Sequence, residues 1–265
     1  MYKKVGYLGP VGSYSKLAAQ TLCPNALHVE YASFYLVVQA LKNKIVDAIV
    51  LPIENSLNGA VMQNLDFLQY NENIIAVKDC KIKIDHRLIY KQGADLKNIT
   101  TVFSHQQALA QCAKFLQQNY ANAKLVATPS TAGCIEMIKS PNQAGIVGAH
   151  LNVPGYELSS FGIADEPNNF TQFLLVVLGR EQKILNHNKI YFSFTCPHEP
   201  GALLSMLSLL KNLNMTKIES RPIKERVGEF RFFVEVEANL YDNNAKAALS
   251  KLKNEAQSFK ILGCY

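Results

Sequence analysis

Hydrophobic positions in the first two thirds of the chain alternate between short apolar runs and stretches with helical spacing. Lys4–Leu8 and Val46–Leu51 are short apolar runs, which are typical of buried strands in a parallel sheet. Between them, the apolar residues after Ser33 recur at positions that share one face of a helix: Phe34, Val37, Val38 and Leu41. This alternation of strand and helix predicts an α/β fold with parallel strands.

The pattern changes where two extended runs, Ile74–Val77 and Lys81–Tyr90, follow each other with little helix between them. We interpret this change as a crossing from one lobe to a second. A second strand–helix set begins at Thr101, and the apolar strand Phe170–Leu178 is expected to return to the first lobe. The predicted lobes cover about residues 1–75 plus 165–179, and residues 76–164.

A polar segment without periodicity, residues 180–188, predicts a linker to a second domain. Six elements follow in the order strand, helix, strand, strand, helix, strand: Lys189–Cys196, Gly201–Leu213, Lys217–Lys224, Glu229–Ala238, Asn243–Ala256 and Ser258–Tyr265. This βαββαβ order is that of the ferredoxin-like fold. The sequence therefore predicts one domain over residues 1–179 and a smaller one over residues 189–265.

The composition agrees with two folded domains and excludes several classes of protein. A chain of 265 residues corresponds to about two domains at roughly 100–200 residues each. With 48% hydrophobic and 18% charged residues the chain can bury a core, which excludes an intrinsically disordered protein. No apolar run approaches the roughly 20 residues that cross a bilayer. Because Met1–Pro10 also lacks the apolar core of a signal peptide, we expect a cytoplasmic protein with no membrane partner.

Charge and cysteine spacing exclude further kinds of site. The 27 basic and 21 acidic residues give a net charge of +6 without a basic run, so no nucleic-acid partner is expected. The six cysteines are scattered and form no C-x-x-C pair, which predicts reduced thiols rather than a zinc site or a disulfide framework. Residues 1–179 contain a single arginine, Arg87, so few bidentate clamps for a carboxylate are available there.

Polar motifs follow the predicted strands at the points where parallel strands end. Ligands of open α/β sheets bind at these carboxyl ends, where loops and helix N-termini converge. Four such motifs are Gly9–Ser15, Pro52–Gly59, Ser104–Leu109 and Ser130–Ala132. Their convergence predicts a small-molecule site between the two lobes.

Each motif also has a plain structural interpretation. The Gly9–Ser15 loop can cradle an anion, or it can simply cap a helix. Glu54 can act as a general acid if burial raises its pKa, or the Glu54-Asn55-Ser56 segment can be a turn. His86 can be a hydrogen-bonded core residue or a proton donor, and the polar residues from Ser104 onward can be helix caps.

Taken together and in this order, the motifs resemble those of the prephenate dehydratase family. The matching segments are Gly9-Pro10-x-Gly12-Ser13-Tyr14-Ser15, Pro52-Ile53-Glu54-Asn55-Ser56 with Gly59, His86-x-Leu88, Ser104-His105-x-Gln107-Ala108-Leu109 with Gln111-Cys112, Ser130-Thr131-Ala132 and Asn169-x-Thr171-x-Phe173. The C-terminal part is similar to a phenylalanine-sensing ACT domain through Pro200-Gly201-Ala202-Leu203 and Thr216-Lys217-Ile218-Glu219-Ser220-Arg221-Pro222. The resemblance spans nearly the whole chain.

The resemblance implies a two-lobed, periplasmic-binding-protein-like catalytic domain followed by a ferredoxin-like ACT regulatory domain. It implies a carbon–oxygen lyase that converts prephenate to phenylpyruvate, water and carbon dioxide in L-phenylalanine biosynthesis. It also implies feedback regulation by L-phenylalanine and an assembly of two or four copies of the chain. Neither a cofactor nor a metal is needed for this reaction.

The resemblance also implies roles for individual residues. Thr171 is the implied catalytic residue, because its hydroxyl can donate a hydrogen bond to the oxygen that leaves the ring. The implied substrate-binding residues are Ser13, Asn55, Ser56, Ser104, His105, Gln107, Gln172 and Phe173. The residues implied to bind the phenylalanine effector are Gly201, Ala202, Leu203, Glu219, Ser220, Arg221 and Pro222.

The sequence departs from the family's Thr-Arg-Phe motif, which reads Thr171-Gln172-Phe173 here. Arginine carries a fixed charge and can bind a carboxylate through two hydrogen bonds, whereas glutamine does neither. Because the loss of a charge-assisted bond costs about 1.5–3 kcal/mol, Gln172 bears on the affinity and identity of the substrate. Two alternatives follow: an arogenate dehydratase, which accepts the amino analogue, and a catalytically weak amino-acid-responsive binding protein on the same scaffold.

Overall fold

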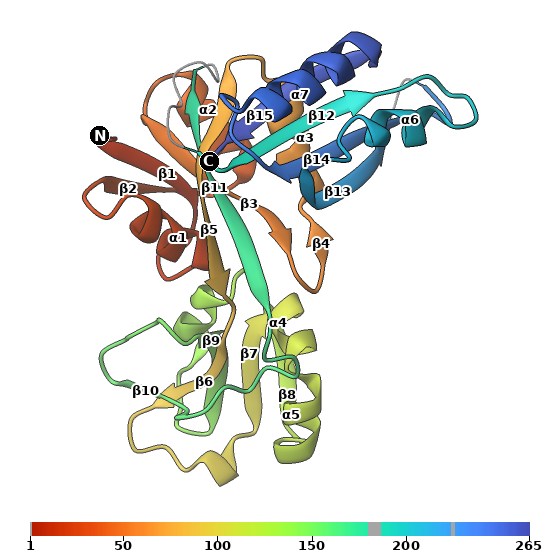
Figure 1. The fold of residues 1–265 in the computed structure, drawn as a ribbon. Helices are drawn as coiled ribbons and strands as arrows, with labels where there is room; N and C mark the ends of the chain where they lie inside the picture. Colours follow the sequence, from red (N-terminus) through yellow and green to blue (C-terminus); the bar gives the residue numbers. More distant parts are fainter. Residues whose placement is uncertain (1, 180–186, 224–225) are drawn as a thin grey trace. The chain divides into compact units, whose positions relative to one another are not determined.

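The computed structural model describes residues 2–179, 187–223 and 226–265 (Figure 1). The chain forms two compact units: the first comprises residues 1–59 and 80–173, and the second comprises residues 60–79 and 174–265. The strands β5 (Ile74–Lys83) and β11 (Phe170–Leu178) therefore belong in part to both units. Both units mix helices and strands, so the predicted α/β class is confirmed.

The first unit begins with a parallel sheet in which β1 lies between β2 and β3. Its elements are, in chain order, β1 (Lys4–Leu8), α1 (Tyr14–Leu22), β2 (Leu27–Tyr31), α2 (Phe34–Lys42), β3 (Ala48–Asn55) and β4 (Gly59–Ala60). The predicted helix after Ser33 is confirmed, because Ser33 caps α2 by accepting a hydrogen bond from Leu36 N. The buried start of β3, Ala48–Leu51, places Asn55 at the carboxyl end of this sheet.

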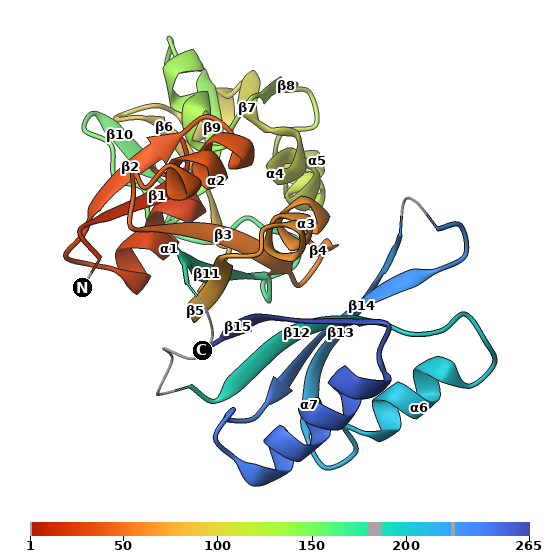
Figure 2. The same ribbon diagram turned by 90° about the horizontal axis from the view of Figure 1, so that it is seen from above.

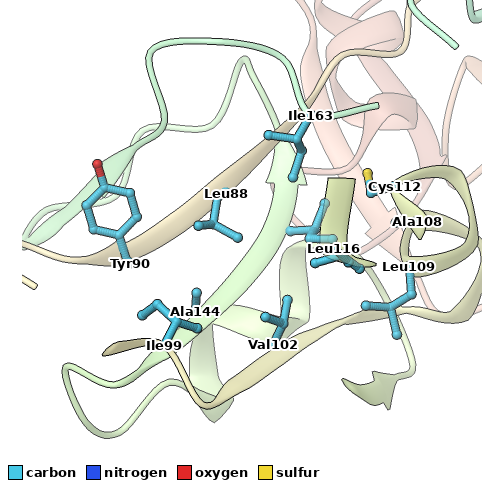
Figure 3. Close-up of a cluster of buried hydrophobic side chains, with 11 residues drawn as sticks. Leu88, Tyr90, Ile99, Val102, Ala108, Leu109, Cys112, Leu116, Ala144 and Ile163 are labelled. Atoms are coloured by element: carbon cyan, nitrogen blue, oxygen red, sulfur yellow. The ribbon is translucent and has the colours of Figure 1, made fainter. Parts of the chain in front are cut away.

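A second sheet of the first unit contains five strands in the order β10-β6-β9-β7-β8. Its elements are β6 (His86–Lys91), η1 (Leu96–Asn98), β7 (Thr101–His105), α4 (Gln106–Gln111), α5 (Ala113–Asn119), β8 (Lys124–Thr128), η2 (Ala132–Met137), β9 (Gln143–Gly148) and β10 (Tyr156–Leu158). Strand β7 runs parallel to β8 and β9, whereas β6 runs antiparallel to β9 and β10. Figure 3 shows the core of this sheet, where Leu88 and Val102 of the strands pack with Leu116 of α5.

The second unit contains the predicted βαββαβ order, which is confirmed. Its elements are α3 (Met62–Tyr70), β12 (Lys189–Thr195), α6 (Ala202–Ser208), β13 (Asn214–Pro222), β14 (Phe230–Glu237), α7 (Asn243–Glu255) and β15 (Ser258–Cys264). The strands pair antiparallel in the order β13-β14-β12-β15, and α6 and α7 lie on one face of this sheet (Figure 2). Phe192 and Phe194 of β12 belong to the core under these helices.

Helix α3 packs against the same sheet through polar contacts. Because side chains alternate along a strand, Ser193 points away from the core that holds its neighbours, and its hydroxyl donates to Gln69 Oε1 of α3. Asp66 of α3 forms an ion pair with Arg221 of β13. Lys260 Nζ donates to three carbonyl oxygens at the end of α3 over 2.7–2.9 Å, those of Leu68, Gln69 and Asn71. These contacts cap the helix, because its last carbonyls have no intrahelical partner.

The predicted domain boundary stays a prediction. Residues 180–186 of the predicted linker lie outside the described residues, as does Lys224 at the end of a predicted strand. By packing, α3 and the adjoining parts of β5 and β11 group with residues 189–265. Among the helices that the structure describes, none combines the length and the apolar character that crossing a membrane requires.

Candidate active site

Asn55 and Thr171 are joined by a hydrogen bond at the carboxyl end of β3. Asn55 Nδ2 donates to Thr171 Oγ1 over 2.9 Å and to Asn169 Oδ1 over 2.7 Å. Asn55 is the last residue of β3, and Thr171 is the second residue of β11. The structure therefore brings together one of the predicted substrate-binding residues and the predicted catalytic residue.

The opposite end of the Asn55 amide is held by the turn that follows β3. Asn55 Oδ1 accepts hydrogen bonds of 3.0–3.1 Å from the backbone N–H groups of Leu57 and Asn58 and from Asn58 Nδ2. This is the Asx turn that the sequence offered as the structural interpretation of the motif. Because the oxygen of the amide faces three donors, its nitrogen must face β11. The turn interpretation of this motif is therefore confirmed, while a general-acid role of Glu54 and a substrate-binding role of Asn55 stay predictions.

Ser56 fixes the chain at the entry to β11. Its backbone N–H donates to Phe170 O over 2.9 Å, and its hydroxyl accepts from Phe170 N over 3.0 Å. The same hydroxyl donates to Asn168 O over 3.3 Å. Ser56 thus holds the backbone immediately before Thr171 and leaves little freedom for the threonine to move.

The Thr171 hydroxyl is buried but keeps its proton for a bound molecule. Its oxygen accepts from Asn55, and within the described part of the chain it makes no other hydrogen bond. A hydroxyl has one proton to donate besides the lone pairs that accept. The arrangement can therefore place a hydrogen-bond donor against an oxygen that gains negative charge during a reaction.

A second polar group links the loop after β1 to the second sheet. The Tyr14 hydroxyl donates to Asp85 O over 2.7 Å, and the ring of Tyr14 lies 4.8 Å from that of His150 between centroids. His150 Nε2 lies 3.0 Å from Gly12 O, and burial lowers the pKa of His150. Gly12 has φ +89°, a left-handed conformation that residues with a side chain rarely adopt, so this loop favours glycine. Sequence reasoning missed His150, although it follows the end of β9 as the other candidate motifs follow their strands.

His86 is a buried, hydrogen-bonded residue, as its structural interpretation holds. Its Nε2 lies 2.9 Å from Gln111 Oε1, and the side chain is 3% exposed. Burial lowers the pKa of His86, so the neutral imidazole donates its proton to Gln111 at neutral pH. Its Nδ1 is buried and has no hydrogen-bond partner within the described residues.

Several of the other predicted substrate-binding residues make contacts within their own part of the fold. Ser13 caps α1 by accepting from Lys16 N, and His105 Nδ1 caps α4 by accepting from Gln107 N over 3.3 Å. The Ser104 hydroxyl is fully buried and donates to Ile146 O of β9 over 2.8 Å. Gln107 is exposed on α4, and Phe173 is buried within β11. The helix-cap interpretation therefore holds for Ser13 and His105, while their binding roles stay predictions.

Gln172 and Thr171 lie on opposite faces of β11, because successive side chains of a strand alternate. Gln172 is 4% exposed. Arg87, the single arginine of residues 1–179, is held by protein groups: Nε and Nη2 donate to Asp85 Oδ2 over 3.2 and 2.9 Å, and Nη1 donates to Ser159 O. The guanidinium of Arg87 is therefore bound to protein groups at the second sheet.

The predicted effector segments both lie in the second unit. Gly201 precedes α6 with φ +82°, and Glu219 and Ser220 lie on β13. Leu203 lines a cavity of about 130 Å³ together with Cys196, Pro197, His198, Glu199, Gly228, Glu229, Phe230 and Phe232. Arg221, another of the predicted effector residues, forms an ion pair with Asp66. The cavity therefore brings residues between β12 and α6 together with Gly228 and Glu229 before β14 and with two phenylalanines of β14.

The cysteine side chains are the remaining candidates for reactive groups and metal ligands. None of the six cysteines, all of which lie within the described residues, forms a disulfide, and Cys112 and Cys134 are fully buried in the second sheet and its helices. Burial raises the pKa of each of these two thiols to about 12, which makes them inert at neutral pH. Among the residues described, no group of three or more His, Cys, Asp or Glu side chains is arranged to hold a metal ion.

Comparison with known proteins identifies the family. Residues 5–183 match the family model described as prephenate dehydratase. The chain is 34% identical over 277 residues to the bifunctional chorismate mutase/prephenate dehydratase of Escherichia coli (strain K12), with 99% of this chain and 70% of that protein covered. It is 32% identical over 280 residues to arogenate dehydratase/prephenate dehydratase 2 of Arabidopsis thaliana, covering 99% of this chain and 72% of that one.

A solved structure agrees with this assignment. The prephenate dehydratase of Arthrobacter aurescens in complex with L-Phe superposes with a TM-score of 0.87 at 25% identity, covering 99% of this chain and 89% of that one. The family match covers the Asn55–Ser56 segment and Thr171, whose contacts form the candidate site. The resemblance found in the motifs is thereby confirmed, and the chain belongs to the prephenate dehydratase family.

Proposed function

We propose that the protein is a prephenate dehydratase, a carbon–oxygen lyase that converts prephenate to phenylpyruvate, water and carbon dioxide. The observation that carries this proposal is the hydrogen bond from Asn55 Nδ2 to Thr171 Oγ1, which leaves the threonine proton to a bound molecule. Membership of the family supports the reaction, and the relatives from Escherichia coli and Arabidopsis thaliana carry dehydratase names.

The reaction requires the protein to bind the prephenate dianion and to stabilise the negative charge on the leaving oxygen. Prephenate is a dianion with one carboxylate on the ring and one on the pyruvyl group. The ring C–O bond breaks with its electron pair on the oxygen, which takes one proton and leaves as water. The bond to the ring carboxylate also breaks, its electron pair completes the aromatic ring, and carbon dioxide leaves. Because aromatisation drives the reaction, the protein has to position the dianion and stabilise the negative charge on the leaving oxygen.

In this proposal the Thr171 hydroxyl donates a hydrogen bond to the leaving oxygen. A threonine hydroxyl is too weak an acid to be the final proton source, so it acts through position, and the proton comes from the solvent. Asn55 and Ser56 hold the threonine in place through the contacts at the start of β11. The further residues proposed to bind substrate are those implied by the resemblance: Ser13, Ser104, His105, Gln107, Gln172 and Phe173.

The test is a turnover assay with purified protein and prephenate, followed by the absorbance of phenylpyruvate in base. The Thr171→Ala variant should lose at least about 100-fold in kcat, which is the typical loss when one transition-state donor is removed. Thr171→Ser keeps the hydroxyl and should retain most of the activity. The absence of any keto acid from the wild-type protein, or full activity of Thr171→Ala, contradicts the proposal.

Arogenate dehydratase is the alternative within the same chemistry, since the Arabidopsis thaliana relative is named for both substrates. Gln172 does not decide between the two substrates. Competition between prephenate and arogenate in one assay separates the two activities. A binding protein without turnover, the second alternative, would bind an amino acid and release no product from either substrate.

We also propose that L-phenylalanine regulates the enzyme through Gly201, Ala202, Leu203, Glu219, Ser220, Arg221 and Pro222. The Arthrobacter aurescens relative in complex with L-Phe supports this assignment. A homodimer or homotetramer and a cytoplasmic location stay predictions from the sequence. Titration of L-phenylalanine against turnover, with sedimentation at each concentration, tests the effector and the assembly together.

A further inference from the structure

Asn169 is a fully buried residue whose side-chain oxygen has a hydrogen-bond partner and whose side-chain nitrogen has none within the described residues. Its side chain is 0% exposed, and its Oδ1 accepts from Asn55 Nδ2 over 2.7 Å. Its backbone oxygen accepts from Ile84 N over 2.8 Å, which fixes the main chain at this point. Its Nδ2 is buried without a hydrogen-bond partner within the described residues. Because a buried unpaired N–H group costs about 1–3 kcal/mol, a side chain that only filled this space would avoid the cost by being apolar.

The contacts around Asn55 allow only one orientation for Asn169. Asn55 Oδ1 faces three N–H donors of its own turn, so its Nδ2 faces Asn169 and Thr171. An amide nitrogen carries two protons, and here they are shared by three acceptors: Asn169 Oδ1 at 2.7 Å, Thr171 Oγ1 at 2.9 Å and, at a longer 3.2 Å, Phe170 O. Asn169 must therefore present its oxygen, and its own nitrogen is left in the buried, unpaired position.

We infer that Asn169 is a positioning residue for the dehydratase reaction, an inference that rests on the proposed function. Its oxygen accepts the shortest hydrogen bond of Asn55 Nδ2 and so fixes the direction of one proton of that amide. The second proton then points at Thr171 Oγ1, which makes the threonine an acceptor toward Asn55 and a donor toward the substrate. Without an acceptor at residue 169, the Asn55 Nδ2 protons are left to Phe170 O and Thr171 Oγ1 alone, so the hydrogen bond to Thr171 loses its fixed direction. The hydroxyl is then no longer directed at the leaving group.

Two substitutions of similar size separate this role from simple packing. Asn169→Leu removes the acceptor and keeps the volume, whereas Asn169→Asp keeps an acceptor in both of its protonation states. We expect kcat to fall by at least 10-fold in Asn169→Leu, with KM changed less than threefold, because the substrate does not touch Asn169. Asn169→Asp should recover to within about threefold of the wild type. If Asn169→Leu does not fold, Asn169→Ala is used in its place as the variant without a side-chain acceptor at residue 169.

The matched control is Asn168→Ala. Asn168 is exposed and contributes its backbone oxygen, which the alanine retains, so this variant should behave as the wild type. A kcat within threefold of wild type for both acceptor-free variants overturns the inference, and so does an Asn169→Asp variant as slow as Asn169→Leu in folded protein. A wild-type protein that makes no phenylpyruvate from prephenate contradicts the proposed function instead. The two failures are therefore distinguishable.

Discussion

Asn55 Nδ2 lies 2.9 Å from Thr171 Oγ1, although 116 residues separate the two in the sequence. The contact forms because β3 ends at Asn55 where β11 begins, with Ser56 holding Phe170 by two hydrogen bonds. A neutral amide donor therefore sets the direction in which the threonine proton points.

Replacing Asn55 by aspartate should abolish this arrangement without changing the size of the side chain. Asn55→Asp sets an oxygen against Asn169 Oδ1 and accepts the Thr171 proton, which the substrate then no longer receives. We expect kcat to fall about 100-fold, the scale of losing one oriented donor. Initial rates with prephenate measure the effect, and the thermal unfolding midpoint shows whether the variant is folded. A folded variant with near wild-type kcat refutes this explanation.

Restoring the family arginine at residue 172 should not speed the reaction. The side chain of residue 172 leaves β11 on the face opposite Thr171, so an arginine there does not reach the leaving oxygen. We expect the kcat of Gln172→Arg to stay within about threefold of wild type. Parallel measurement of kcat and KM for both proteins checks this. A gain of 10-fold or more would mean that glutamine impairs the native site.

The buried His86 should make the protein less stable in mild acid. Because burial lowers its pKa in the folded state, the unfolded chain binds the proton more readily near its ordinary pKa of about 6.5. The stability from the neutral imidazole is therefore present above that pH and lost as pH falls below it, by at most about 1.4 kcal/mol per pH unit. Urea unfolding between pH 5 and 8 measures the slope. His86→Gln should show a flatter profile, and an unchanged slope would assign the effect to other groups.

Asp66 and Arg221 should stabilise the second unit as a pair. Both side chains are about three-quarters buried, at 23% and 26% exposure, and tie α3 to β13. A double-mutant cycle with Asp66→Asn and Arg221→Gln should give a coupling energy of about 1 kcal/mol in urea unfolding. Strictly additive effects of the two substitutions would show that the ion pair contributes nothing.

Local patterns in the sequence predict most of the elements but not how all of them group. The apolar spacing after Ser33 predicts α2, and the strand predicted over Lys189–Cys196 corresponds to β12. That α3 packs with the C-terminal sheet depends on pairs far apart in sequence, such as Gln69 with Ser193. No periodicity within α3 carries that information, because these contacts are polar and tertiary.

The candidate site was predictable only in part. The resemblance points to Thr171 and Asn55, but composition alone makes Thr171 an ordinary strand residue. Asn169 lies in the same motif, yet its role depends on burial and on the direction of one amide, which spacing does not reveal. His150 was missed because its partner, Gly12 O, belongs to the backbone of a distant loop.

The two buried thiols beside the second sheet can report on local opening of the structure around them. Cys112 and Cys134 are fully covered and protonated, so a thiol reagent reacts with them only when the surrounding helices and strands open. The alkylation rate of these sulfurs, followed by mass spectrometry, therefore measures how often the structure around the second sheet opens locally. The readout needs no engineered label.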